Sequence, residues 1–119
     1  MPSAGRHFEQ SLALLKRDPD PAMVTDVRAM QGMLMLNRGQ VRDARARLQE
    51  CLAFWSAQKH PRWVALCELQ LGLIEERAEN RAASLASSGR SRRRYVQVNA
   101  RVQAAAVAQH QQRVEAMRP

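Results

Sequence analysis

Two stretches of the sequence decide the fold: Met30-Gln31-Gly32-Met33-Leu34-Met35-Leu36-Asn37-Arg38-Gly39 and Leu66-Cys67-Glu68-Leu69-Gln70-Leu71-Gly72-Leu73-Ile74. Each places a glycine, Gly32 or Gly72, inside an apolar run typical of a helix. A glycine inside a helix costs about 1 kcal/mol relative to alanine, so its presence indicates the close approach of a second helix. Small residues at Gly32 and Ala44 would let two antiparallel helices touch backbone to backbone. The pattern therefore predicts an all-α fold of antiparallel helix hairpins.

Prolines and glycines mark the ends of the predicted helices. Asp20 suits an N-cap and Pro21 the first helical position that follows it. Gly39 suits the left-handed residue after a helix, and Pro61 marks a further helix start. We therefore expect helices over residues 3–17, 21–36, 40–58 and 61–76.

The last third of the chain has weaker signals. A short helix is expected over residues 78–86, followed by a loop at Ser87-Ser88-Gly89, because serine and glycine are common in turns. After Arg90 we expect a C-terminal helix whose apolar stripe holds Tyr95, Val98, Val102 and Ala105.

The hairpin pattern resembles the tetratricopeptide (TPR) repeat, in which helix pairs stack into a curved surface that binds peptides. The packing positions of the first unit are Gly32, Ala44, Leu48 and Cys51. The second unit keeps only its first helix, around Gly72. The resemblance implies a small curved solenoid. We expect a TPR-like helical domain over residues 1–89, and composition distinguishes a basic Ala/Val/Gln-rich C-terminal helix or arm over residues 90–119.

Length and composition agree with one small helical protein. The chain has 119 residues, of which 45% are hydrophobic and only 4% aromatic. No run approaches the ~18 apolar residues that span a bilayer, and residues 1–16 lack the apolar core of a signal peptide. We therefore expect a cytoplasmic protein, in which Cys51 and Cys67 are buried thiols.

The net charge of +8 is concentrated at the C-terminal end. Residues 81–119 hold eight arginines and one acidic residue, and four of these arginines cluster at Arg90, Arg92, Arg93 and Arg94. This basic segment fits a solvated arm, a surface that docks onto an acidic protein, or a nucleic-acid site. Only Tyr95 could stack on a base, so nucleic acid is not the partner we expect first.

No group of residues predicts catalysis. His7, His60 and His110 lie far apart and have no metal-ligand spacing with Cys51 or Cys67. The sequence contains no glycine-rich phosphate loop and no nucleophile elbow. We expect neither enzymatic activity, nor a metal, nor a cofactor.

A more specific similarity covers residues 29–89. The segment Pro61-Arg62-Trp63-Val64-Ala65-Leu66-Cys67-Glu68-Leu69-Gln70-Leu71-Gly72-Leu73 resembles the small TPR-like chaperones of bacterial type III secretion, which hold the needle subunit. That family has a Pro-Trp pair, then Ala-Leu-Cys-Glu and Leu-Gly-Leu in the same order. Upstream it has an Asn-x-Gly turn, as in Asn37-Arg38-Gly39.

The resemblance implies a chaperone that keeps a needle-type subunit, a virulence component, as a monomer in the cytoplasm before export. The subunit's amphipathic helix would lie in the concave groove, and a second small helical co-chaperone would assist. We place the groove at five large apolar residues, while Trp63 is either a core anchor or a contact with the co-chaperone. The groove residues are Met33, Leu36, Leu66, Leu69 and Leu73.

Three alternatives stay open. The apolar residues could be the core of an ordinary helix bundle, and the chain could be a generic TPR-type adaptor for another peptide. From another class, it could be a basic helical protein that binds nucleic acid.

Overall fold

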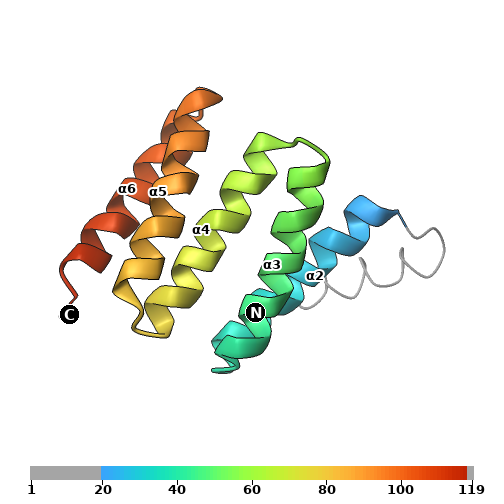
Figure 1. The fold of residues 1–119 in the computed structure, drawn as a ribbon, viewed down its shortest axis with the longest axis horizontal. Coiled ribbons are helices and arrows are strands. Elements are labelled where there is room, and N and C mark those ends of the chain that lie inside the picture. Colours follow the sequence, from blue (N-terminus) through green and yellow to red (C-terminus); the bar gives the residue numbers. More distant parts are fainter. Residues whose placement is uncertain (1–19, 118–119) are drawn as a thin grey trace, which may run out of the picture.

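The computed structural model describes residues 20–117, which form five α-helices (Figure 1): α2 (Pro21–Asn37), α3 (Val41–Ala57), α4 (Pro61–Arg77), α5 (Arg81–Gln97) and α6 (Arg101–Glu115). Each helix packs against the next along the chain, and α2 also reaches α4. The described residues contain no strand. The predicted all-α stack of helix hairpins is therefore confirmed. The helix expected over residues 3–17 lies outside the described residues.

The helices begin at evenly spaced positions, and their first residues are Pro21, Val41, Pro61, Arg81 and Arg101. A hairpin with its two turns thus runs from Pro21 to His60, which is longer than the about 34 residues of a TPR hairpin. Each turn has one residue in the left-handed region, with φ between 54° and 80°. The backbone N–H of this left-handed residue and that of the following residue donate hydrogen bonds to carbonyls in the last turn of the preceding helix. These bonds close the end of the helix. These residues are Gly39, Lys59, Glu79 and Asn99.

The hairpin repeat continues into α5, although its residue types change. Helix α3 buries Ala44, Leu48, Cys51 and Trp55. At the equivalent positions of the next hairpin, α5 buries Ser84, Ser88, Ser91 and Tyr95. The two glycines follow the same register. A Cβ on Gly32 would meet Leu48, and a Cβ on Gly72 would meet Ser88. Both glycines are thus explained by the close approach of the next helix, as predicted.

Buried serines let α5 pack against α4 without large side chains. Ser84 Oγ donates to the Gly72 carbonyl at 2.8 Å, and Ser91 Oγ donates to the Ala65 carbonyl at 2.7 Å. A buried hydroxyl without a partner is costly, and these two bonds satisfy the hydroxyls. The α4–α5 contact is therefore held by polar contacts as well as by burial.

Two expectations for the last third of the chain are wrong. Residues 87–89 are not a loop, because they lie within α5. The same helix runs through residues 89 and 90, where the two expected domains meet. The expected stripe is also displaced: Val98 lies in a turn and Val102 is 80% exposed. The buried face of α6 holds Ala104, Val107, His110 and Val114 instead.

Candidate protein-binding groove

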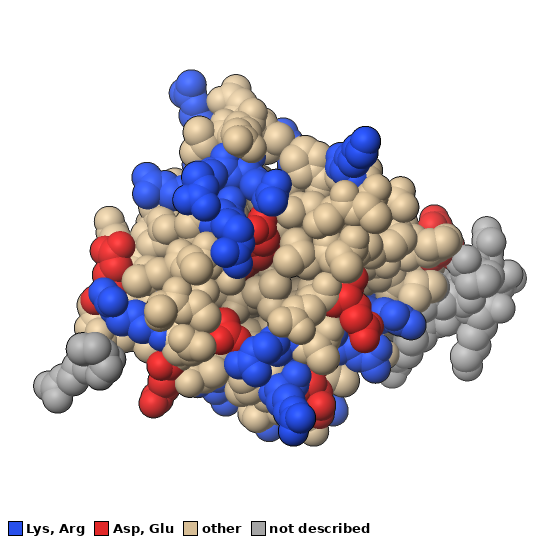
Figure 2. All heavy atoms as spheres, viewed as in Figure 1, with Lys and Arg blue, Asp and Glu red and all other residues tan. Residues whose placement is uncertain are grey.

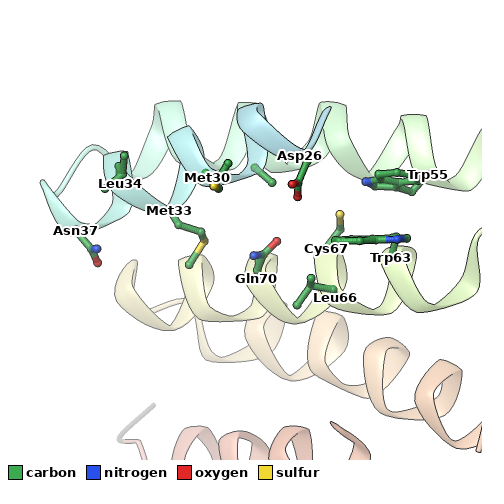
Figure 3. Close-up of a pocket in the computed structure, with 11 residues that line it drawn as sticks. Asp26, Met30, Met33, Leu34, Asn37, Trp55, Trp63, Leu66, Cys67 and Gln70 are labelled. Atoms are coloured by element: carbon green, nitrogen blue, oxygen red, sulfur yellow. The ribbon is translucent and has the colours of Figure 1, made fainter. Parts of the chain in front are cut away.

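An apolar groove of about 250 Å³ lies between α2 and α4 (Figure 3). The helix α2 supplies one wall, α4 supplies the other, and Trp55 of α3 closes one end. Eight of the eleven lining residues are apolar or thiol side chains. The lining residues are Asp26, Ala29, Met30, Met33, Leu34, Asn37, Trp55, Trp63, Leu66, Cys67 and Gln70.

The α2 wall follows from the spacing of its side chains. Asp26, Met30, Leu34 and Asn37 recur at intervals of three to four residues, which places them along one side of a helix. At 1.5 Å per residue, the wall from Asp26 to Asn37 is roughly 16 Å long. Leu34 is 40% exposed, a large fraction for a leucine, because it stands on the rim. The groove thus offers about three helical turns of apolar surface.

Two tryptophans form the end of the groove opposite Asn37. The rings of Trp55 and Trp63 stack with 5.2 Å between centroids and 16° between planes. Phe54 and His60 pack edge-on against Trp55. Stacked aromatic rings present a large apolar surface at little cost in conformational entropy. These are the only two tryptophans in the chain, so its indole fluorescence reports on this end of the groove.

Only three lining side chains are polar, and one of them carries charge. Asp26 and Gln70 point into the groove from opposite walls (Figure 3). The Oε1 atom of Gln70 is buried and accepts no hydrogen bond within residues 20–117. Burial raises the pKa of the Cys67 thiol to about 12, so this group is neutral at physiological pH. The lining therefore carries a single formal charge, the carboxylate of Asp26.

The structure separates the residues that the sequence assigned to the groove. Met33 and Leu66 line it. Trp63, expected in the core or at a co-chaperone contact, lines it as well. Leu36 does not, because it is buried in the core with Ala44, Leu48, Leu71 and Ile74. Leu69 packs instead against the cluster of Ala65, Tyr95, Ala100, Ala104 and Val107. Leu73 is half-buried on α4 outside the groove lining.

Sequence reasoning missed Met30, Leu34, Trp55, Cys67 and Gln70. Met30 and Leu34 continue the apolar stripe of α2, and a stripe as wide as this one has a core side and a groove side. Gln70 lies one turn after Leu66 on α4, so the helical period of Leu66 could have located it. No sequence signal places Trp55 of α3 at the end of a groove between two other helices.

The arginine cluster is part of α5 rather than an arm. Basic side chains gather over one half of this helix in Figure 2. Arg90 and Arg94 both pair with Glu68 of α4, whose side chain is only 3% exposed. Arg92 donates to Gln111 of α6 at 3.4 Å. Two of the four arginines thus neutralise the buried carboxylate of Glu68.

A serine, a histidine and a carboxylate meet where α4, α5 and α6 join. Ser84 Oγ lies 3.4 Å from His110 Nε2, and His110 Nδ1 lies 3.4 Å from Glu76 Oε1. The three residues follow the order of a catalytic triad, in which a serine nucleophile contacts a histidine base and a carboxylate orients that histidine. However, Ser84 is fully buried and its hydroxyl donates to the Gly72 carbonyl. Burial lowers the pKa of His110, and the Arg113 hydrogen bond lowers the pKa of Glu76. The arrangement ties the three helices together.

Two negative findings apply to the described part of the chain. Among residues 20–117, no three histidine, cysteine or acidic side chains are placed to hold a metal ion. None of the described helices is both long and apolar enough to cross a membrane.

Comparisons with protein-family models, curated proteins and solved structures give no match to this chain.

Proposed function

We propose that this chain binds another protein by holding an amphipathic helix in the groove between α2 and α4. The observation that carries the proposal is an exposed apolar channel about three helical turns long, with stacked tryptophans at one end. Apolar channels of this kind receive helices through anchors at positions i, i+3 or i+4, and i+7. Such a ligand helix extends about 10 Å over these anchors, which fits the roughly 16 Å wall of α2.

The side chains of the groove suit a ligand of irregular shape. Met30 and Met33 are flexible and polarisable, so they adapt to different apolar surfaces. Leu34 and Leu66 give the two walls branched apolar edges. Burial of this surface would drive association, while the cost of ordering the ligand limits the affinity.

For the biological role we propose a cytoplasmic chaperone of type III secretion that holds a needle-type subunit. The support is the sequence similarity over residues 29–89, and in particular the segment from Pro61 to Leu73 that forms most of α4. Trp63 and Leu66 of that segment face the groove. A helix covered by α2 and α4 would be unable to join a growing fibre. A second small helical co-chaperone is part of this proposal, and the generic peptide adaptor is its alternative.

Nucleic-acid binding has less support. Arg90 and Arg94 already share Glu68, and the Tyr95 ring is buried. The α5 surface therefore lacks an exposed aromatic side chain on which a base could stack.

The test is affinity capture of the tagged chain from the organism that encodes it, with the captured proteins identified by mass spectrometry. We expect a small helical export subunit in the wild-type sample and its loss with Leu66→Asp, which places a charge in the groove. Val102→Asp is the matched control, because Val102 is 80% exposed on α6. Capture of the same subunit by Leu66→Asp would contradict the proposal.

A second arm of the test asks whether capture prevents polymerisation. The purified export subunit should stay monomeric when wild-type chain is added at equal concentration, as measured by light scattering. It should polymerise when Leu66→Asp is added instead. Polymerisation at the same rate in both samples would contradict the chaperone role and would favour the alternative, a generic peptide adaptor.

A further inference from the structure

We propose that the groove selects a helix that carries one basic residue within its apolar face, and that this residue pairs with Asp26 and Gln70. The inference rests on the proposed function, and it adds the chemical character of the partner. It depends on two observations about the groove lining: the charge of Asp26, and the buried oxygen of Gln70 that lacks a hydrogen bond.

The groove lining carries one charge. Asp26 is the single charged residue in the lining, and it pairs with no basic side chain within residues 20–117. It is now half-buried, so water still reaches its carboxylate. A ligand helix laid between α2 and α4 would displace that water. An entirely apolar ligand would leave a buried, unpaired carboxylate, which is strongly unfavourable.

The Gln70 amide lies across the groove from Asp26 (Figure 3). Its Oε1 atom is buried between the two walls and accepts no hydrogen bond in the described structure. Buried side-chain acceptors in native proteins nearly always have a donor. Asp26 and Gln70 point into the groove from facing helices (Figure 3), so one donor placed between them could serve both.

A lysine or arginine meets both requirements. Its ammonium or guanidinium group carries the positive charge that would pair with the Asp26 carboxylate, and it donates several hydrogen bonds. Its aliphatic stem can lie along Met30 and Leu66 while the charged end reaches the two polar groups. A single polar contact inside an apolar interface fixes the register of paired helices. The same contact would therefore fix where the ligand helix stops along the groove.

The expected preference runs against the overall charge of the protein. The chain carries a net charge of +8, so its long-range field repels a basic peptide. A preference for lysine would therefore have to come from the groove itself.

The experiment uses the full chain and three designed peptides. Each peptide is an alanine-rich helix with leucine at positions i, i+7 and i+11, and they differ only at i+4, which holds lysine, norleucine or glutamate. None contains tryptophan, so the fluorescence of Trp55 and Trp63 reports binding. Titrations are made with wild type, Asp26→Asn, Leu66→Asp and the control Asp43→Asn, whose carboxylate is exposed in the first turn of α3.

We expect the lysine peptide to bind wild type about tenfold more tightly than the norleucine peptide, as desolvated charge pairs do elsewhere. The glutamate peptide should bind most weakly. The lysine preference should disappear in Asp26→Asn and persist in Asp43→Asn. Equal or tighter binding of the norleucine peptide to wild type would overturn the inference while leaving helix binding intact.

The outcomes also separate this inference from the function on which it rests. If no peptide binds, or if Leu66→Asp binds all three as wild type does, the groove is not a helix-binding site and both proposals fail. If all three bind in the groove with equal affinity, only the selection by Asp26 fails.

Discussion

A Cβ atom on Gly72 would lie 2.6 Å from the hydroxyl oxygen of Ser88, closer than real Cβ contacts allow. This relationship explains why a glycine interrupts the apolar run of α4. The backbone of α4 lies against α5, and α5 in turn presents small hydroxyl side chains. The Ser88 oxygen is itself buried without a hydrogen-bond partner in the described structure.

The first prediction concerns this pair. Gly72→Ala should lower the free energy of unfolding by about 1–3 kcal/mol, because the added methyl group overpacks the α4–α5 contact. Ser88→Ala removes an unsatisfied buried hydroxyl and should be neutral or stabilising. The double variant should lose less than the sum of the two single variants, measured by urea denaturation. Strictly additive values would show that the two residues do not conflict.

The second prediction concerns the turn after α4. Glu79 adopts φ of 59°, a conformation that costs a non-glycine residue about 1–2 kcal/mol. Glu79→Gly relieves that cost and should raise the free energy of unfolding by about 0.5–1 kcal/mol, after the entropy cost of glycine is subtracted.

The control for the turn is the neighbouring residue. Ala78 has φ of −78°, where glycine gains nothing, so Ala78→Gly should destabilise the fold. The measurement is the melting temperature of both variants relative to wild type, by thermal denaturation. A lower melting temperature for Glu79→Gly than for wild type would contradict the left-handed assignment.

The third prediction concerns the carboxylate shared by two arginines. Arg90→Ala or Arg94→Ala alone should cost about 1 kcal/mol or less, because the other arginine still compensates Glu68. The double variant leaves a buried carboxylate without a partner and should cost about 3 kcal/mol or more. Urea denaturation measures this non-additivity, with Arg92→Ala/Arg93→Ala as the exposed control. Additive losses would argue against a shared ion pair.

The fourth prediction is a loss of stability in acid. Burial lowers the pKa of His110 below its ordinary 6.5, so the unfolded chain binds a proton before the folded chain does. Stability should therefore be full above about pH 6.5 and should fall as the pH drops toward the lower folded pKa. The pKa of Glu76 is lowered from 4.5, so it adds a further loss below that pH, with the same sign.

The check is a series of urea denaturations between pH 5 and 8, extended down to pH 3 for wild type and Glu76→Gln. Between pH 5 and 8, His110→Gln should flatten the slope of the free energy of unfolding against pH. This holds even if the variant is less stable than wild type at every pH. Glu76→Gln should change the slope mainly below pH 4.5. An unchanged slope in His110→Gln would mean that another group is responsible for the acid loss.

The sequence predicted the first three described helices because clear signals mark their ends. Pro21 and Pro61 begin helices, and Gly39 occupies a left-handed turn, as expected. The remaining turns contain no glycine or proline. Asn99 adopts the left-handed conformation between α5 and α6, but nothing distinguishes it in sequence from other asparagines.

The serine and glycine residues at 87–89 misled the prediction for a physical reason. Such residues favour turns in isolation, whereas here the neighbouring α4 requires small side chains on a continuous helix. Tertiary packing overrides local preference at this place.

For the groove, helical period located Met33 and Leu66 but also included the core residue Leu36. Which edge of an apolar stripe faces a groove depends on where the next hairpin packs, and that information is not local.

The most direct test of the groove is site-specific photo-crosslinking. A diazirine amino acid replaces Leu66 in the groove or Val102 on the exposed face of α6, and the tagged chain is irradiated in the organism that encodes it. We expect position 66 to crosslink to one amphipathic segment of a partner protein, with no such product from position 102. Crosslinks from position 102 to the same segment, with none from position 66, would contradict the account.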